Sequence, residues 1–284
     1  MAYNIFFDTE TTGIGVEDEI IQIGAIITNE RGELFDNGVF DELCSSLVPI
    51  KLKAMATHGI RQEDIEDKPE FKKSRFWKVL NELNSEDNYL IAHNLPFDLS
   101  MLKKYGFEDK FQLIDTYKCS MHLFDLHVSH QSAGFAKEDE IEDEIRDKNN
   151  NLVPDYQLQT FRYKLFSKVD EENEMQKYGI KVKAHDAIGD VLILKMFLKE
   201  LFLRVKREFR LSNDEVMNKL VELSNAPVKL KMMTFGKHRG LSFEEILQTD
   251  RGYLEWLLRE QEKSGEKCDE NLKYTLKEWL KSAF

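Results

Sequence analysis

The stretch Ile5-Phe6-Phe7-Asp8-Thr9-Glu10 places two acids directly at the end of a short apolar run. The run predicts a buried β-strand, on which successive side chains point to opposite faces. Asp8 and Glu10 therefore project from one face, and Thr9 points away from it. Two buried like charges repel each other strongly unless a cation lies between them. The pair fits a cation site, and it equally fits two unrelated acids at a solvated strand end.

Length and composition predict one large domain and a small one, since 284 residues with 42% hydrophobic content supply a sizeable core. No run approaches the roughly 18 apolar residues of a membrane span. The first residues lack the basic-then-apolar order of a signal peptide. Three scattered cysteines, none in a C-x-x-C pair, argue against a disulfide framework or a structural zinc site. We therefore expect a cytoplasmic protein with no membrane contact.

Charge is unevenly distributed along the chain, whose formal net charge is -12. Residues 137–148 hold seven acids against three bases, whereas residues 204–240 hold nine Lys and Arg against four acids. Phosphate contacts require Lys and Arg, so an acidic total is awkward for a nucleic-acid binder. Because the second segment is locally basic, the total charge does not exclude nucleic acid.

Apolar periodicity in the first half predicts an α/β arrangement that opens with an antiparallel meander. The meander joins the first strand to strands expected at residues 19–28 and 34–47. The remaining expected elements are helices at 53–60 and 71–83, a strand at 88–92, a helix that begins near Pro96, a strand at 111–116 and a helix at 117–126.

Periodicity fails from His127 to Pro154, which is polar and acidic, and we expect an exposed insertion there. Helical spacing resumes at 156–165. A long amphipathic helix is expected from the segment 185–190 to about Val205. Ser212 and Glu215 form a capping-box pattern for another helix, to about Leu223.

A break at Ala226-Pro227 precedes a small C-terminal α+β module. We expect an apolar strand that ends at Phe235, a basic turn at 236–240, and helices near 242–247, 251–260 and 270–282. The predicted division is therefore a domain at 1–205, a helical linker at 206–227 and the module at 228–284.

Three more polar residues stand where α/β proteins usually place ligands, at the junctions that follow strands or open helices. Asp98 begins a helix after a central strand, and His185 and Asp190 flank the start of the late helix. Residues five apart differ by roughly 140° around a helix. We therefore expect Asp186 to cap the helix, Asp190 to lie in its first turn, and His185 to lie on the preceding loop.

A cluster of Asp and Glu side chains suits two hard divalent cations, Mg²⁺ or Mn²⁺, better than zinc. Two such metals, about 3.5–4 Å apart, activate a water, hold a scissile phosphate and stabilise the leaving 3′ oxygen. His185 would then accept the proton of the attacking water as general base. The plainer alternative is that His185 is a surface histidine before a helix.

Three motifs, in this order, resemble the DEDDh 3′–5′ exonucleases, which are related to the proofreading exonucleases of DNA polymerases. The motifs are FDTETTG (Phe7–Gly13), AHNLPFD (Ala92–Asp98) and HDAIGD (His185–Asp190). AMATHGI (Ala54–Ile60) is similar to the family's segment between the first two motifs. The resemblance implies a ribonuclease-H-like mixed sheet flanked by helices. It also implies the following site residues: Asp8, Glu10, Asp98 and Asp190 as metal ligands, and His185 as the base.

The tail narrows the resemblance, because residues 233–240 and 250–258 are similar to the C-terminal region of exodeoxyribonucleases of the X type. This similarity implies release of mononucleotides from DNA 3′ ends, single-stranded or frayed. Two rivals stay open. One is a 3′–5′ exoribonuclease, and the other is a catalytically silent nucleic-acid-binding or polymerase-accessory module.

Further substrate contacts are expected on two turns and at one helix start. Thr11, Thr12 and Gly13 either face the terminal nucleotide or serve only the turn. The basic turn either grips a phosphate or is a plain exposed turn. The candidate substrate-binding residues are Thr11, Thr12, Gly13, Asn94, Lys237 and Arg239.

Overall fold

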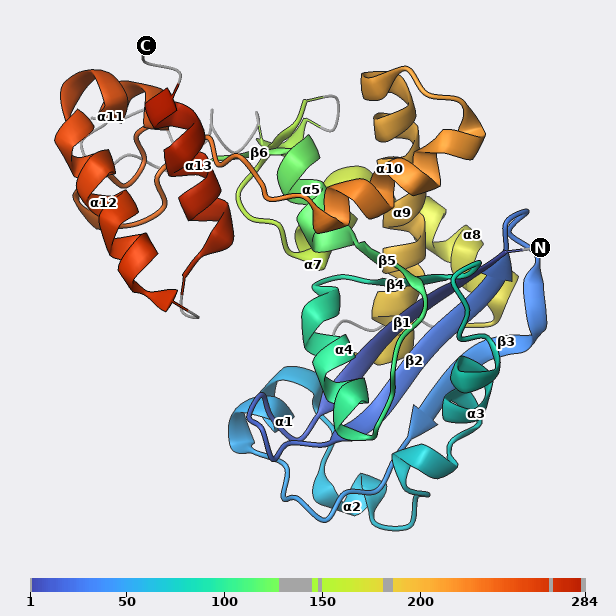
Figure 1. The fold of residues 1–284 in the computed structure, drawn as a ribbon. Coiled ribbons are helices and arrows are strands. Elements are labelled where there is room, and N and C mark those ends of the chain that lie inside the picture. The colour runs from blue at the N-terminus through green and yellow to red at the C-terminus, as the bar shows by residue number, and fades with distance from the viewer. Residues whose placement is uncertain (1, 128–144, 148–149, 181–185, 266–267, 282–284) are drawn as a thin grey trace.

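A computed structural model of the chain describes residues 2–127, 145–147, 150–180, 186–265 and 268–281 (Figure 1). Its main sheet has five strands in the order β3-β2-β1-β4-β5. The strands are β1 (Tyr3–Thr11), β2 (Ile20–Asn29), β3 (Leu34–Leu43), β4 (Tyr89–Ala92) and β5 (Gln112–Asp115). β1 and β3 are antiparallel to β2, whereas β4 is parallel to β1 and β5. The predicted mixed sheet and its opening meander are confirmed.

The helices expected in the first half are present with changes at their ends, and one short helix, Gln62–Ile65, was not predicted. They are α1 (Leu52–His58), α2 (Gln62–Ile65), the 3₁₀ helix η1 (Phe71–Lys73), α3 (Arg75–Glu82), α4 (Leu95–Lys104) and α5 (Thr116–Leu123). α1 ends at Gly59, which has a φ of 76°. Glycine adopts this left-handed conformation with little steric strain because it has no Cβ. The single helix expected at 71–83 is divided at Ser74, because its side chain accepts a hydrogen bond from the amide of Trp77 and caps α3.

Helices of the second half are α7 (Leu158–Leu165), α8 (Lys168–Tyr178), α9 (Ala187–Phe209) and α10 (Asn213–Asn225). α8 was not predicted, although Ser167 and Asp170 form the capping box that opens it. Most of the insertion expected at 127–154 lies outside the described residues. Its last part is not a free coil, because β7 (Leu152–Val153) pairs in parallel with β6 (Asp125–Leu126) and Val153 is fully buried.

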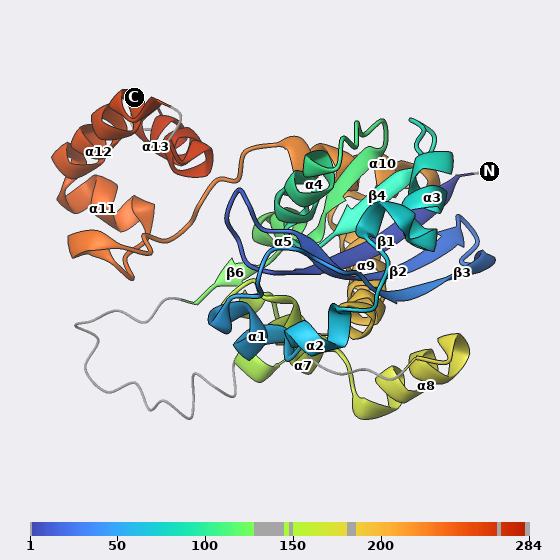
Figure 2. The same cartoon turned by 90° about the horizontal axis from the view of Figure 1, so that it is seen from below.

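Two cores lie on opposite faces of the sheet, since β1 alternates its side chains between them. Phe6 belongs to the core formed with α5, α7, α9 and α10. Phe7 belongs to the core formed with α3 and α4. Figure 2 shows α9 on one side of the sheet and α3 and α4 on the other. This arrangement places the carboxyl end of β1 between α4 and the first turn of α9.

α10 lies in the stretch expected as a linker, and it is part of the first core through Val216, Leu220 and Leu223. We propose that the connection to the C-terminal module begins near Ala226, where α10 ends. Among the described residues, no helix is both long enough and apolar enough to span a membrane.

The C-terminal module holds the 3₁₀ helix η2 (Gly236–His238), α11 (Phe243–Thr249), α12 (Arg251–Lys263) and α13 (Glu270–Lys281). Its small core is separate from the other two and includes Met233, Leu254 and Leu276. The strand expected to end at Phe235 is wrong as a regular element. Met232 forms only an isolated bridge with Ser242, because the chain turns at once into η2.

Candidate active site

Asp8 and Glu10 extend from the face of β1 that α9 covers, as the strand pattern predicts. They alternate with Thr9, which lies on the opposite face and is buried. Asp98 lies in the first turn of α4 and is only 3% exposed. Asp190 lies in the first turn of α9. The sheet and the starts of two helices therefore bring the four predicted acids to one region.

Thr9 connects Asp98 to the strand that carries the first acid pair. Its backbone amide donates to Oδ1 of Asp98 at 3.1 Å, and its hydroxyl donates to the same oxygen at 2.6 Å. These bonds satisfy one oxygen of a buried carboxylate. The strand pattern predicted only that Thr9 lies on the face opposite Asp8 and Glu10. The structure shows that Thr9 also holds Asp98 in the first turn of α4 against β1.

Gly24 lets α9 reach the sheet beside Asp8. The two residues are direct partners in the β1–β2 register. A Cβ on Gly24 would lie 2.3 Å from the carbonyl carbon of Ala187 and 2.4 Å from the amide nitrogen of Ile188. Real Cβ atoms essentially never approach this closely, so only glycine fits. The first turn of α9, and with it Asp190, therefore lies directly over the strand.

Gln22 holds the residue that opens α9. Its side-chain amide nitrogen donates to Asp186 at 2.9 Å and to Asp41 at 3.0 Å, and its oxygen accepts from the amide of Ala187. Asp186 occupies the N-cap position and Asp190 follows in the first turn, as predicted, although Asp186 makes no side-chain cap bond. His185, the predicted base, lies outside the described residues.

Gln159 of α7 holds Asp190 from the other side. Its amide nitrogen donates to Oδ1 of Asp190 at 2.6 Å. Arg162, one turn later, donates to the oxygen of Gln159 at 3.3 Å and to both oxygens of Glu171, at 2.8 and 2.7 Å. An arginine paired in this bidentate way is a firm anchor. The chain of contacts therefore orients Asp190.

Burial raises the carboxyl pKa values of the acid cluster most, and charge repulsion adds to the shifts of Asp8 and Glu10. Burial, followed by the nearby carboxylates of Asp98 and Glu10, raises the pKa of Asp8 well above its ordinary value. Burial and then Asp190 and Asp98 raise the pKa of Glu10 to about 8. Burial also raises the pKa of Asp98 to about 7, although the Thr9 hydrogen bonds oppose the shift. Without a cation, the cluster favours bound protons.

Carboxylate oxygens in this density are the donor set of a hard divalent cation. As placed, however, no three His, Cys, Asp or Glu side chains in the described ranges are arranged to hold a metal ion together. The donors fit a cation chemically, and they do not form a closed coordination shell in this arrangement.

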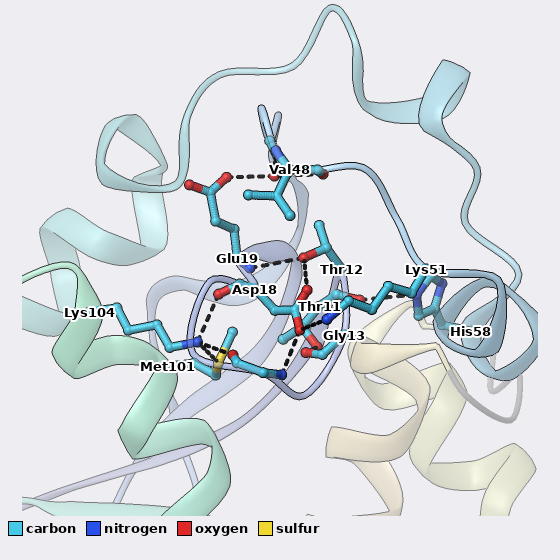
Figure 3. Close-up of polar contacts among 12 residues, drawn as sticks. Thr11, Thr12, Gly13, Asp18, Glu19, Val48, Lys51, His58, Met101 and Lys104 are labelled. Atoms are coloured by element: carbon cyan, nitrogen blue, oxygen red, sulfur yellow. Dashed lines mark hydrogen bonds and ion pairs between the residues drawn. The ribbon is translucent and has the colours of Figure 1, made fainter.

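The turn after β1 is held from several sides (Figure 3). The hydroxyl of Thr11 donates to the carbonyl of Gly13, and that of Thr12 donates to Asp18 and accepts from the amide of Glu19. Both side chains are buried. These contacts belong to the turn itself, which leaves little of either hydroxyl for a nucleotide.

Two basic residues and a histidine complete the support of this turn. Lys51 pairs with Asp18, and Lys104 donates to the carbonyls of Gly15 and Asp18. Nε2 of the buried His58 lies 3.3 Å from the carbonyl oxygen of Thr11. His58 lies in the AMATHGI segment, so that segment contacts the first motif directly.

The other predicted substrate residues lie in different places. Asn94 is exposed at the N-cap of α4 with a φ of 72°, and its backbone amide donates to the carboxylate of Asp115. Asparagine tolerates this left-handed conformation better than most residues. Lys237 and Arg239 are exposed in the C-terminal module, which lies apart from the sheet in both views (Figures 1 and 2). The structure does not bring these two to the acid cluster.

Four supporting residues were missed by reasoning from the sequence, namely Gln22, Gly24, Gln159 and Arg162. Gly24, within an apolar strand, carried the clearest signal, because an isolated glycine in a strand often marks a close approach of another backbone. No local pattern singled out Gln22, Gln159 or Arg162, since their contacts join segments distant in sequence.

Comparison with known proteins agrees with this geometry. The family model described as Exonuclease matches residues 5–197, and the one described as Exodeoxyribonuclease X-like C-terminal matches residues 233–262. A DNA polymerase III subunit epsilon-like protein of Rhodobacter capsulatus is 38% identical over 105 residues, which span 35% of this chain and 14% of that protein. The DNA polymerase III subunit epsilon of Rickettsia prowazekii is 32% identical over 139 residues, which span 42% of this chain and 55% of that protein.

A solved structure of exonuclease I shares the fold, with a TM-score of 0.51 and 15% identity over 74% of this chain and 43% of that chain. The chain thus spans about half or less of the length of these relatives. Because the exonuclease model covers well over half of the chain, the chain belongs to the exonuclease family, with a C-terminal region similar to that of exodeoxyribonuclease X.

Proposed function

We propose that this chain is a metal-dependent 3′–5′ exodeoxyribonuclease, which hydrolyses phosphodiester bonds from DNA 3′ ends and releases mononucleotides. The acid cluster of Asp8, Glu10, Asp98 and Asp190 carries the proposal, because the burial of its carboxylates, together with the repulsion that Asp8 and Glu10 experience from the others, favours a bound cation. Two observations support DNA as the substrate. The curated relatives are DNA polymerase III subunits, and the tail matches an exodeoxyribonuclease model.

Asp8 and Glu10 from β1, Asp98 from α4 and Asp190 from α9 would hold two divalent cations, Mg²⁺ or Mn²⁺. When bound, such cations activate a water, hold the scissile phosphate and stabilise the leaving 3′ oxygen. Thr9 keeps Asp98 oriented. Gln159 does the same for Asp190.

His185 accepts the proton of the attacking water as general base in this proposal. It directly precedes Asp186, which Gln22 holds at the start of α9. The family motif HDAIGD carries both His185 and Asp190. The substrate contacts proposed nearby are the backbone of Thr11–Gly13 and the exposed side chain of Asn94.

Digestion of end-labelled oligonucleotides tests the proposal. A 5′-labelled DNA strand should shorten in a ladder with Mg²⁺, and a 3′-labelled strand should release labelled mononucleotide from the start. EDTA should stop both reactions. Asp8→Asn should abolish the ladder, whereas Asp36→Asn, which changes an exposed acid of β3, should leave it unchanged.

Different results would identify the rivals. A ladder from RNA but not from matched DNA would favour the exoribonuclease. Binding of DNA with no metal-dependent shortening would favour the silent module. A ladder of the opposite polarity, or full activity of Asp8→Asn, would contradict the proposal outright.

A further inference from the structure

The C-terminal module carries exposed aromatic rings that its own core does not use. Phe235 is 44% exposed and Trp256 is 47% exposed. Neither belongs to the cluster of buried and half-buried apolar residues that holds the module together. Exposed rings that cluster on one surface often mark an interaction site, so their neighbours decide whether these two do.

Tyr253 contacts Trp256 on one side and the basic turn that follows Phe235 on the other. Its ring centroid lies 5.6 Å from that of Trp256, with the planes inclined at 40°. Nζ of Lys237 lies 4.9 Å from the centre of the Tyr253 ring. A Cβ on Gly236, next to Phe235, would lie only 2.8 Å from the Tyr253 hydroxyl, so the basic turn rests directly on the tyrosine. We call Phe235, Lys237, Arg239, Tyr253 and Trp256 the aromatic platform.

Asp250 holds the basic turn in place and decides which cation is left for a ligand. Its carboxylate accepts from Nζ of Lys237 at 2.6 Å and lies 2.9 Å from Nε2 of His238. Hydrogen bonds from these two side chains lower the pKa of Asp250 to about 2, so it stays ionised. Lys237 is therefore neutralised, whereas Arg239 is exposed and no ion pair is found for it among the described residues.

Exposed aromatic rings combined with cationic side chains are the features with which proteins bind single-stranded nucleic acid without sequence preference. The rings stack on bases, and the cation contacts the phosphates between them. Duplex DNA keeps its bases stacked inside, so it offers no face to such rings. Two acids near platform residues are paired, Asp250 with Lys237 and Glu255 with Arg251, which reduces their repulsion of a phosphate.

We propose that the aromatic platform binds single-stranded DNA, stacking bases on Trp256 and Phe235 while Arg239 contacts the backbone. The inference rests on the proposed exonuclease function, and it assigns the module a specific part in it. By holding the strand that enters the acid cluster, the platform raises the number of nucleotides removed per encounter. It does not touch the reacting phosphate.

Binding of a 5′-fluorescein-labelled dT20 to the full chain in EDTA tests the platform without any turnover. Trp256→Ala should weaken the affinity about 5- to 150-fold, the range expected when one base loses its stacking partner. Trp256→Phe keeps an aromatic face and should restore most of the affinity. Arg239→Ala should reduce the slope of log K against log salt by about 0.7, the share of one phosphate contact.

Phe209→Ala is the matched control, because Phe209 is an exposed ring on α9 that also carries a lysine, Lys219, over its face. Its affinity for dT20 should equal that of the wild type. Circular dichroism checks that each variant is folded. With Mg²⁺ and an unlabelled trap, Trp256→Ala should release fewer nucleotides per encounter and keep its rate on a trinucleotide.

Two outcomes separate this inference from the proposed function. A wild type that binds dT20 through Trp256 but never shortens it would keep the platform and contradict the exonuclease. Metal-dependent shortening, combined with equal dT20 affinity of wild type, Trp256→Ala and Arg239→Ala, would overturn the platform and keep the exonuclease.

Discussion

Replacing Gly24 with alanine adds a methyl group where the first turn of α9 crosses β2. The new Cβ would lie 2.3 and 2.4 Å from backbone atoms of Ala187 and Ile188, whereas ordinary contact begins near 3.4 Å. Both distances are therefore about 1 Å shorter than an ordinary contact. No rotamer change relieves this close approach, because the crowded atoms are backbone, so the helix start must shift by about that distance. Asp190, three residues after Ala187, must shift with it.

Two effects of different size should follow from Gly24→Ala. Overpacking of this kind costs about 1–3 kcal/mol of stability. Misplacing a catalytic group by about 1 Å lowers a rate about 100-fold. We therefore expect a folded protein whose exonuclease rate falls about 100-fold, which is more than its modest loss of stability explains.

Initial rates on a 5′-labelled oligonucleotide with saturating Mg²⁺ measure the loss of exonuclease rate, and urea unfolding measures the loss of stability. Gly252→Ala is the control, because the nearest atom to its new Cβ, in Asp250, is 4.0 Å away. It should keep the wild-type rate and stability or gain slightly in stability. A Gly24→Ala protein with the wild-type rate would refute the claim that this close approach positions Asp190.

Three further predictions concern the cluster and its supports. In EDTA, the free energy of unfolding should fall as pH rises from 5 to 8, because the folded-state pKa values of Glu10 and Asp98, about 8 and about 7, exceed their ordinary values of 4.5 and 3.8. Urea titrations at pH 5 and pH 8 measure this fall in stability, and saturating Mg²⁺ should remove most of it. A stability that rises with pH in EDTA would contradict the prediction. Gln159→Leu removes the donor to Asp190 and should lower the exonuclease rate about tenfold, the effect of one hydrogen bond of about 1.4 kcal/mol; an unchanged rate would exclude this role. Thr9→Val removes a hydroxyl donor to Asp98, so the acid limb of the kcat/KM profile should move to higher pH, and the protein should lose about 1–3 kcal/mol of stability at pH 8; an identical profile would argue against the contact.

Local patterns carried much of the fold and the placement of the acids. The two-residue period of β1 placed Asp8 and Glu10 on one face, and this depends only on strand geometry. The start of α9 followed from its apolar face and from Asp186 at the cap, because such signals lie within a few residues of one another.

Contacts between distant segments could not be predicted in this way. Gln159 meets Asp190 across 31 residues, and Gln22 meets Asp186 across 164. Their side chains carry no local pattern that distinguishes them from any surface glutamine. The apolar residues before Phe235 predicted a strand for a related reason, since a short apolar run does not reveal whether a partner strand exists.

Calorimetric titration with Mn²⁺ at pH 7, in two buffers of different ionisation enthalpy, tests the central claim that the acid cluster is a cation site. The wild type should bind Mn²⁺ and release about one proton or more, because the pKa of Glu10, about 8, keeps that carboxyl largely protonated at pH 7 before the metal binds, and the pKa of Asp8 is raised as well. Asp36→Asn should behave in the same way, and Asp8→Asn should lose the binding. Absence of binding, binding without proton release, or an unchanged titration of Asp8→Asn would contradict the account.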